Sequence, residues 1–248
     1  MTRRIAIVTG GIGGLGSAMC HSLADAGCRV VAADLAKRTE RIEAFKQEMS
    51  DYGDRVRFAP VDVSSGESCK ALIESVTEAD GSVDIVVNAA GITRDASLRK
   101  MDLAQWQDLM RVNMDSLFHM CRPVVEGMCE RGFGRIINIS SVNGQTGQFG
   151  QTNYSAAKAG VHGFTMALAR EVARKGVTVN TVSPGYCDTA LVQAVPEKIR
   201  EQIIAQVPVG RLGDPADIAR AVAFLAADDA GYITGANLPV NGGYFMSF

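Results

Sequence analysis

Short runs of β-branched residues alternate with longer helical patterns along the whole chain. Some of these runs, such as residues 85–87, are apolar at every position, which is typical of strands buried on both faces. A parallel sheet with helices on both faces explains both observations. The expected strands are residues 3–9, 29–34, 55–61, 83–88, 135–140, 177–183 and 237–240.

The helical patterns between these runs predict a single domain. Helices are expected over residues 14–27, 65–80, 102–131 (as one helix or with a break) and 151–175, and from Asp214, because Asp followed by Pro is typical of a helix start. No Pro-, Gly- or Ser-rich linker and no repeat interrupts the 248 residues. We therefore expect one α/β domain over residues 1–248, with a Rossmann-type doubly wound sheet that binds ligands at the carboxyl ends of its strands.

The charge balance and the cysteines exclude several classes of protein. With 25 Lys and Arg against 27 Asp and Glu, the net charge is −2, which argues against nucleic-acid or membrane partners. The apolar run at residues 5–8 is too short for a signal peptide, which needs about 7–15 apolar residues. The six cysteines form no CxxC pair and none lies at metal-ligand spacing from histidine. We expect free thiols, no metal site and a cytoplasmic protein.

A glycine-rich segment, TGGIGGLG at residues 9–16, directly follows the first expected strand. Glycines let the backbone turn tightly and approach a pyrophosphate, whose charge then faces a helix N-terminus. Between a strand and a helix, the segment predicts a dinucleotide site, with a structural turn as the alternative. The candidate residues are Gly10, Ile12, Gly13, Gly14, Leu15 and Gly16.

Asp34 ends the second expected strand. A carboxylate at this position accepts hydrogen bonds from the ribose hydroxyls of adenosine and repels a 2′-phosphate, which favours NAD(H). Lys37 and Arg38 follow closely and either side chain is long enough to bind a 2′-phosphate, so NADP(H) remains an alternative.

Tyr154 and Lys158 lie four residues apart on an expected helix and therefore share one face. An ammonium group beside a phenol favours the phenolate and lowers the pKa of the tyrosine from about 10, which suits it to general acid–base work. Ser141, just past the fifth expected strand, is placed to hold a substrate carbonyl.

These residues occur with others in an order that resembles the short-chain dehydrogenase/reductase family. The motifs are the glycine segment, Asn88-Ala89-Ala90-Gly91, Asn113, Ser141, Tyr154-x-x-x-Lys158, and Pro184-Gly185 with Thr189. They extend over nearly the whole chain and are specific in combination. Within the family, residues 91–95, 99–101 and 138–154 most resemble the acetoacetyl-CoA reductases of polyhydroxybutyrate synthesis.

The resemblance implies an oxidoreductase that reduces acetoacetyl-CoA to (R)-3-hydroxybutyryl-CoA with a hydride from a nicotinamide cofactor. It implies that Asn113 anchors a water between Lys158 and solvent and completes a catalytic set with Ser141 and Tyr154. Further cofactor contacts implied by it are Asp62 and Val63 at adenine, Asn88, Ala89, Ala90 and Gly91 at the ribose, and Pro184, Gly185 and Thr189 at the nicotinamide, opposite Tyr154 and Lys158.

The segment between Ser141 and Tyr154 is expected to line the substrate pocket, with Phe149 as an apolar wall. By resemblance, the substrate contacts are Asp95, Lys100, Ser141, Gln148, Phe149, Gln151 and Tyr186. Arg94, Arg99 and Lys100 form a basic group that suits the phosphates of coenzyme A. A solvated loop is the alternative for these charges.

The last part of the chain carries an amphipathic pattern and an apolar end. Residues 188–207 are expected to form a lid over the substrate or a plain packed helix. Family members commonly form tetramers, and the long helices at 102–131 and 151–175 are the expected contacts. The apolar end at residues 240–248 is expected to dock on its own or a neighbouring subunit.

Three other functions remain open on the sequence. A 3-oxoacyl-acyl-carrier-protein reductase would accept the same pantetheine arm but needs a basic docking surface. A polyol or alcohol dehydrogenase suits Asp34 but leaves the substrate segment unexplained. A non-catalytic dinucleotide sensor is disfavoured because Asn113, Ser141, Tyr154 and Lys158 are all present.

Overall fold

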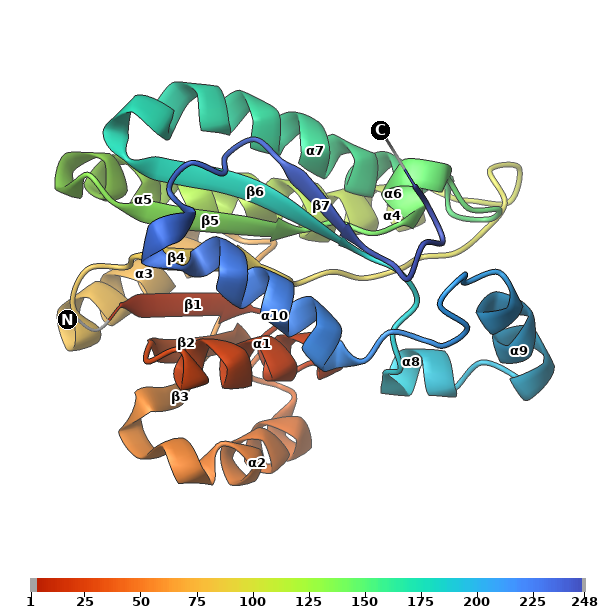
Figure 1. Cartoon of the computed structure of the whole chain (residues 1–248), viewed down its shortest axis with the longest axis horizontal. Helices are drawn as coiled ribbons and strands as arrows, with labels where there is room; N and C mark the ends of the chain where they lie inside the picture. The colour runs from red at the N-terminus through yellow and green to blue at the C-terminus, as the bar shows by residue number, and fades with distance from the viewer. Residues whose placement is uncertain (1–3, 247–248) are drawn as a thin grey trace.

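Seven parallel strands form one sheet in the computed structural model, which describes residues 4–246 (Figure 1). The strands are β1 (Ile5–Thr9), β2 (Arg29–Asp34), β3 (Val56–Pro60), β4 (Ile85–Asn88), β5 (Gly134–Ile139), β6 (Val177–Pro184) and β7 (Asn237–Val240). Their order in the sheet is β3-β2-β1-β4-β5-β6-β7. The chain adds β2 and β3 on one side of β1, and then adds β4 and the later strands on the other side. This change of side opens a crevice at the carboxyl ends of the strands, where doubly wound sheets bind ligands.

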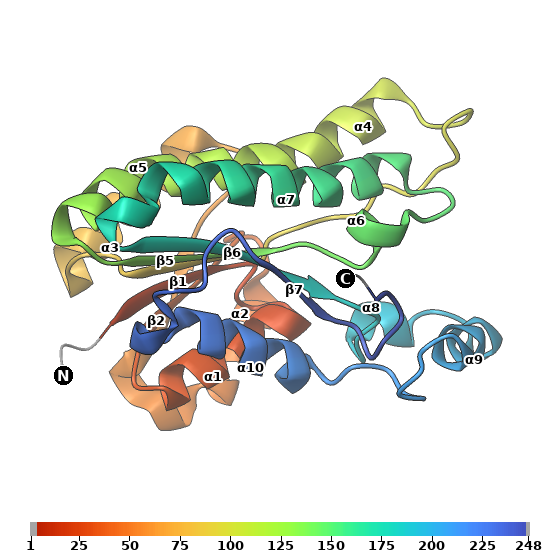
Figure 2. The same cartoon turned by 45° about the horizontal axis from the view of Figure 1, so that its top comes forward.

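Helices cover both faces of the sheet (Figure 2). One layer consists of α1 (Gly14–Asp25), α2 (Thr39–Glu48) and α10 (Pro215–Ala226), and the other of α3 (Gly66–Asp80), α5 (Ser116–Arg131) and α7 (Thr152–Val172). Each layer buries its own apolar cluster against the strands, represented by Met19 and Val222 on one face and by Leu72 and Met120 on the other. The α/β fold predicted from the sequence is therefore confirmed.

The boundaries differ from the prediction in instructive places. Every expected strand is present, with ends that differ by at most two residues; Arg3, the expected start of the first, lies outside the described residues. Helix α2 was not predicted from the sequence. The expected helix over residues 102–131 is α4 (Leu103–Met110), a π-helical turn (Arg111–Asp115) and then α5. Single 3₁₀ turns lie at Ala173–Lys175 and Asp228–Ala230, and a 3₁₀ segment with a kink at Gly53 lies at Ser50–Arg55.

The segments that follow the carboxyl ends of β5 and β6 carry three short helices. These are α6 (Asn143–Thr146), α8 (Ala190–Gln193) and α9 (Glu197–Ala205). The expected lid over residues 188–207 is thus two helices with a break at Pro196. They project beyond the sheet (Figure 1), and α9 has no buried residue.

The helices and the side-chain clusters of residues 4–246 bear on membranes and metals. None of the helices there combines the length and apolarity that crossing a bilayer requires. That part of the chain also holds no group of three or more His, Cys, Asp or Glu side chains arranged to bind a metal ion. All six cysteines fall within it and are free thiols.

Candidate active site

The glycine segment makes the turn from β1 into α1. Gly10 has φ +65°, and a Cβ atom there would lie 3.0 Å from the backbone of Ala90. A Cβ on Gly16 would lie 2.1 Å from the carbonyl oxygen of Gly10, so only glycine lets the turn close. The N-terminus of α1 has no side-chain cap and no acidic residue in its first turn. Its free N–H groups are therefore available to an anion.

A groove of about 630 Å³ runs past this turn. Its lining fits a dinucleotide, with backbone and small side chains at one end and an acidic side chain at the other. Predicted cofactor residues in the lining are Gly10, Gly13, Gly14, Leu15, Gly16, Asp34, Asp62, Val63, Ala89, Ala90, Gly91 and Thr189. Ile12 is buried and Asn88 donates to the side chain of Asn138 instead.

At the far end of this groove, Asp34 pairs with Arg38. The two carboxylate oxygens of Asp34 accept from the N–H of Leu35 at 2.8 Å and from Nη1 of Arg38 at 2.8 Å. Asp34 is buried, whereas the Arg38 side chain is 41% exposed. Lys37 is not in the lining. The groove therefore presents an acidic and a basic group side by side.

Asn113 fixes the segment after β4 from the π-helical turn. Its Oδ1 accepts from the N–H of Ile92 at 2.8 Å, and its Nδ2 donates to the carbonyl oxygen of Ile92 at 2.9 Å. A Cβ atom on Gly91 would lie 3.4 Å from this Oδ1 and 3.5 Å from Nζ of Lys158. π-helical turns often occur at functional sites, and this one brings Asn113 beside Lys158.

Lys158 is buried on α7 and donates from Nζ to the carbonyl oxygen of Ile139, at the end of β5, over 2.8 Å. Burial lowers the pKa of Lys158 to about 8, because the charged form loses its hydration. A lysine in this state exchanges its proton near neutral pH.

Tyr154 stands one turn earlier on α7. Burial raises the pKa of Tyr154, while a hydrogen bond with Ser141 lowers it. Nζ of Lys158 lies 5.8 Å from the centre of the phenol ring and bonds to Ile139. The expected fall in the pKa of Tyr154 is therefore not present here, because desolvation is the largest cause.

A second cavity of about 500 Å³ contains Ser141, Tyr154 and Lys158. It shares Leu15, Ala89, Gly91, Ile92 and Thr189 with the groove, so the two are continuous. Predicted residues that also line it are Gln151, Pro184, Gly185 and Tyr186. A ligand in this cavity would meet a hydroxyl, a phenol and a lysine together.

A string of amide side chains forms one wall. Nδ2 of Asn143 donates to Oε1 of Gln151 at 2.9 Å, and Nε2 of Gln151 donates to Oδ2 of Asp95 at 2.9 Å. Burial raises the pKa of Tyr186, and a hydrogen bond with Asn143 opposes this rise. Oδ1 of Asn143 is buried without a partner, so one acceptor remains for a ligand.

Four predicted substrate residues lie outside the lining of this cavity. They are Asp95, Lys100, Gln148 and Phe149, and Phe149 is 91% exposed. Sequence reasoning missed Asn143, although it follows Ser141 by two residues within the expected pocket segment. It also missed Thr9, whose hydroxyl accepts from the N–H groups of Ala89 and Ala90 at 3.1 and 3.2 Å.

Comparisons with known proteins agree with this geometry. A family model described as enoyl-(acyl carrier protein) reductase matches residues 10–245. An acetoacetyl-CoA reductase of Allochromatium vinosum is 55% identical over 98% of this chain and 99% of its own. The acetoacetyl-CoA reductase of Cupriavidus necator is 50% identical over 99% and 100%. A 3-oxoacyl-[acyl-carrier-protein] reductase of Vibrio cholerae is 47% identical over 98% of each chain. The chain therefore belongs to the short-chain dehydrogenase/reductase family.

Proposed function

We propose that this protein reduces acetoacetyl-CoA to (R)-3-hydroxybutyryl-CoA with NADH, in polyhydroxybutyrate biosynthesis. The observation that carries the proposal is the single cavity that contains Ser141, Tyr154 and Lys158 and continues into the dinucleotide groove. The similarity to acetoacetyl-CoA reductases over nearly the full length supports the choice of substrate. The R configuration follows from the family resemblance.

The chain's own side chains carry the proton chemistry. Ser141 donates a hydrogen bond to the substrate's 3-oxo oxygen, and Tyr154 donates the proton that this oxygen takes up. Lys158, with its pKa near 8, returns a proton toward Tyr154, and Asn113 holds the water that links Lys158 to solvent. When bound, the reduced nicotinamide supplies the hydride. Pro184, Gly185 and Thr189 would hold its ring.

NADH is the proposed cofactor because Asp34 is buried at the end of β2 with its carboxylate facing the groove. A 2′-phosphate placed there would meet a negative charge. Arg38 favours NADPH instead, because this residue lines the same groove and its positive charge would attract a 2′-phosphate. The Asp34–Arg38 pair thus sets the balance between the two cofactors.

We further propose that the protein is a homotetramer in the cytoplasm. Phe118 on α5 and Met166 on α7 are 60% and 52% exposed, and apolar exposure on the two long helices suits a contact between subunits. The free cysteines suit a reducing compartment.

The test is the initial rate of acetoacetyl-CoA reduction with NADH and with NADPH. Faster oxidation of NADH is expected. Fast turnover with NADPH alone would support acetoacetyl-CoA as the substrate and contradict the role given to Asp34. No turnover with either would contradict the substrate.

The 47% identical relative supports a second candidate, reduction of a 3-oxoacyl group on an acyl carrier protein. The basic residues Arg94, Arg99 and Lys100 are exposed, and Arg94 lines the substrate cavity; an acidic carrier would require such basic groups. Parallel assays with acetoacetyl-CoA and an acetoacetyl carrier protein separate the two. A kcat/KM at least about tenfold higher for the carrier form would favour this candidate.

A further inference from the structure

The C-terminal segment, residues 240–246, holds both ends of the lid over residues 188–207. Before the lid, the N–H of Gly185 donates to the carbonyl oxygen of Val240 at 2.9 Å. After it, the N–H of Val209 donates to the carbonyl oxygen of Gly242 at 3.1 Å. The segment docks on its own subunit, which is one of the two outcomes expected from the sequence; residues 247 and 248 lie outside the described residues.

The lid is tied together by its own side chains. Nε2 of Gln193, on α8, donates to Oδ1 of Asp188. Oε1 of the same Gln193 accepts from Nη1 of Arg200, on α9, at 2.7 Å. These bonds join α8 and α9, so the position of the whole lid depends on how its two ends are held.

Tyr244 connects the end of the lid to the substrate cavity. Its hydroxyl donates to Oε1 of Gln206, directly after α9, at 3.2 Å. Its ring meets the ring of Tyr186 edge to face, with the centres 5.5 Å apart, and Tyr186 lines the cavity that contains Tyr154. One side chain therefore contacts both the lid and the pocket wall.

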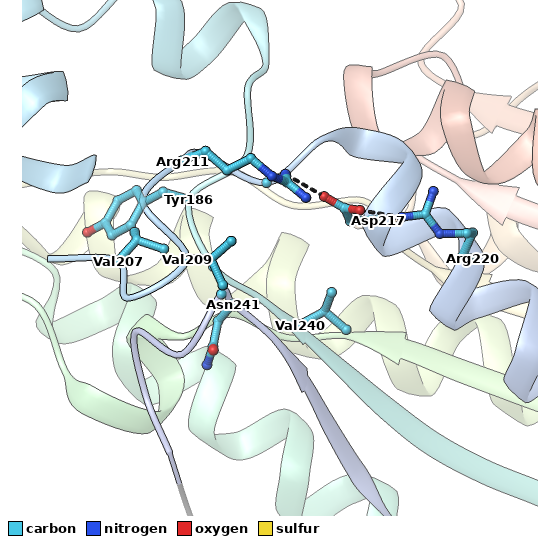
Figure 3. A pocket seen from close by; sticks show the side chains of 11 residues that line it. Tyr186, Val207, Val209, Arg211, Asp217, Arg220, Val240 and Asn241 are labelled. Carbon is cyan, nitrogen blue, oxygen red and sulfur yellow. Dashed lines mark hydrogen bonds and ion pairs between the residues drawn. The ribbon is translucent and has the colours of Figure 1, made fainter. Parts of the chain in front are cut away.

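A third cavity, of about 280 Å³, lies behind Tyr186. Figure 3 shows Tyr186 there beside Val207 and Val209, with Asn241 of the C-terminal segment near Val209 and its amide directed away from both valines. Tyr186 therefore lines both this cavity and the substrate cavity, and the contact with Tyr244 contributes to the position of its ring.

We propose that Tyr244 is a positioning residue for the acyl-thioester substrate, because it fixes the Tyr186 ring and the end of the lid relative to each other. The inference rests on the proposed function for its choice of substrate. Loss of Tyr244 contacts loosens the lid and weakens substrate binding. Two residues of the lid, Thr189 and Ala190, line the dinucleotide groove. They lie at the first end of the lid and Gln206 lies at its last, so cofactor binding changes less than substrate binding.

The experiment compares Tyr244→Phe, which keeps the ring and loses the hydroxyl, with Tyr244→Ala, which loses both. The KM for acetoacetyl-CoA is expected to rise about fivefold in the first variant and about thirtyfold in the second. We expect kcat and the Kd of NADH to change by less than about twofold in Tyr244→Phe. Tyr232→Phe is the matched control, because Tyr232 is fully exposed.

Limited trypsin digestion gives a readout that does not depend on the substrate. Lys198 and Arg200 lie in α9, and Arg174 and Lys175 on the 3₁₀ turn after α7 serve as internal reference sites. Cleavage in α9 relative to the reference is expected to increase in both Tyr244 variants and in Gln206→Leu. Combining Tyr244→Phe with Gln206→Leu is expected to add nothing to either single change.

The outcomes separate the two proposals. Unchanged cleavage in α9 together with an unchanged KM would overturn the role of Tyr244. Additive effects in the double variant would show that Gln206 and Tyr244 act separately, which also overturns it. A wild-type protein that does not reduce acetoacetyl-CoA contradicts the proposed function, and faster cleavage in α9 would then still support the role of Tyr244 in holding the lid.

Discussion

The dinucleotide groove and the substrate cavity are adjacent, yet they are built in different ways. The groove is formed by strand ends, by glycines that admit no side chain, and by α1, which buries six of its residues. The cavity is closed by loops that side-chain hydrogen bonds join, and by a lid whose α9 buries none. Backbone geometry therefore fixes one half of the site, the dinucleotide groove, whereas a few side chains fix the other half, the substrate cavity. Substitutions in the cavity should change substrate preference with less damage to the fold than substitutions in the groove would cause.

The largest effect is expected in the cavity, from Tyr154→Phe. This change removes the acidic hydroxyl and keeps the ring, so kcat should fall about 10³-fold. The Kd of NADH should stay within about twofold of the wild type if the two halves bind independently. Stopped-flow turnover and a fluorescence titration of NADH measure the two quantities. Retained turnover would contradict the mechanism.

Lys158 lies where the two halves meet, and its burial predicts a pH-dependent stability. Its pKa is lowered to about 8 from the ordinary value of 10.5. Between these values the unfolded chain binds more protons than the folded one, so the free energy of unfolding should rise with pH, by about 3 kcal/mol in total. Denaturant unfolding at pH 7 and pH 10 measures the rise, and Lys158→Met should lack this contribution. Equal pH dependence in both proteins would mean that Lys158 keeps an ordinary pKa.

In the groove, Asp34→Asn should change cofactor choice and leave the substrate cavity alone. Loss of the carboxylate removes the repulsion of a 2′-phosphate and frees Arg38 to bind it, so the ratio of kcat/KM for NADPH to that for NADH should rise about thirtyfold. Arg38→Gln should shift the ratio the other way. Asp51→Asn, at an exposed position, is the control. A change in the KM for acetoacetyl-CoA of similar size would show that the two halves are coupled.

The smallest effect is expected from Asn143→Ala, at the wall of the cavity. The amide holds Gln151 in place, and its loss should raise the KM for acetoacetyl-CoA about threefold without changing the Kd of NADH. Gln148→Ala provides the comparison within the same segment, because Gln148 lies outside the cavity lining. A larger rise in KM from Gln148→Ala than from Asn143→Ala would support the contact between Gln148 and substrate that the family resemblance implies.

The same difference explains how well the sequence predicted each half. The strands and the glycine segment follow from local rules, because burial on both faces and a turn with φ +65° at Gly10 restrict the residue types. Ser141, Tyr154 and Lys158 were proposed as catalytic residues from their order and spacing, and all three line one cavity.

The rest depended on contacts between distant segments, which spacing does not encode. The string from Asp95 through Gln151 to Asn143 and the bond between Tyr244 and Gln206 required the folded chain. The pKa of Tyr154 differed from expectation for the same reason, since adjacency to Lys158 suggested a charge effect and the surroundings supplied a larger desolvation.

The π-helical turn at Arg111–Asp115 has a consequence for how the family's chains can vary in length. It holds one residue more than a regular turn, and each residue advances an α-helix by about 100°. Removal of a single residue would join α4 and α5 into one regular helix and rotate Asn113 away from Ile92 and Lys158. The catalytic role proposed for Asn113 therefore depends on helical phase, so a deletion here would do more harm than most substitutions.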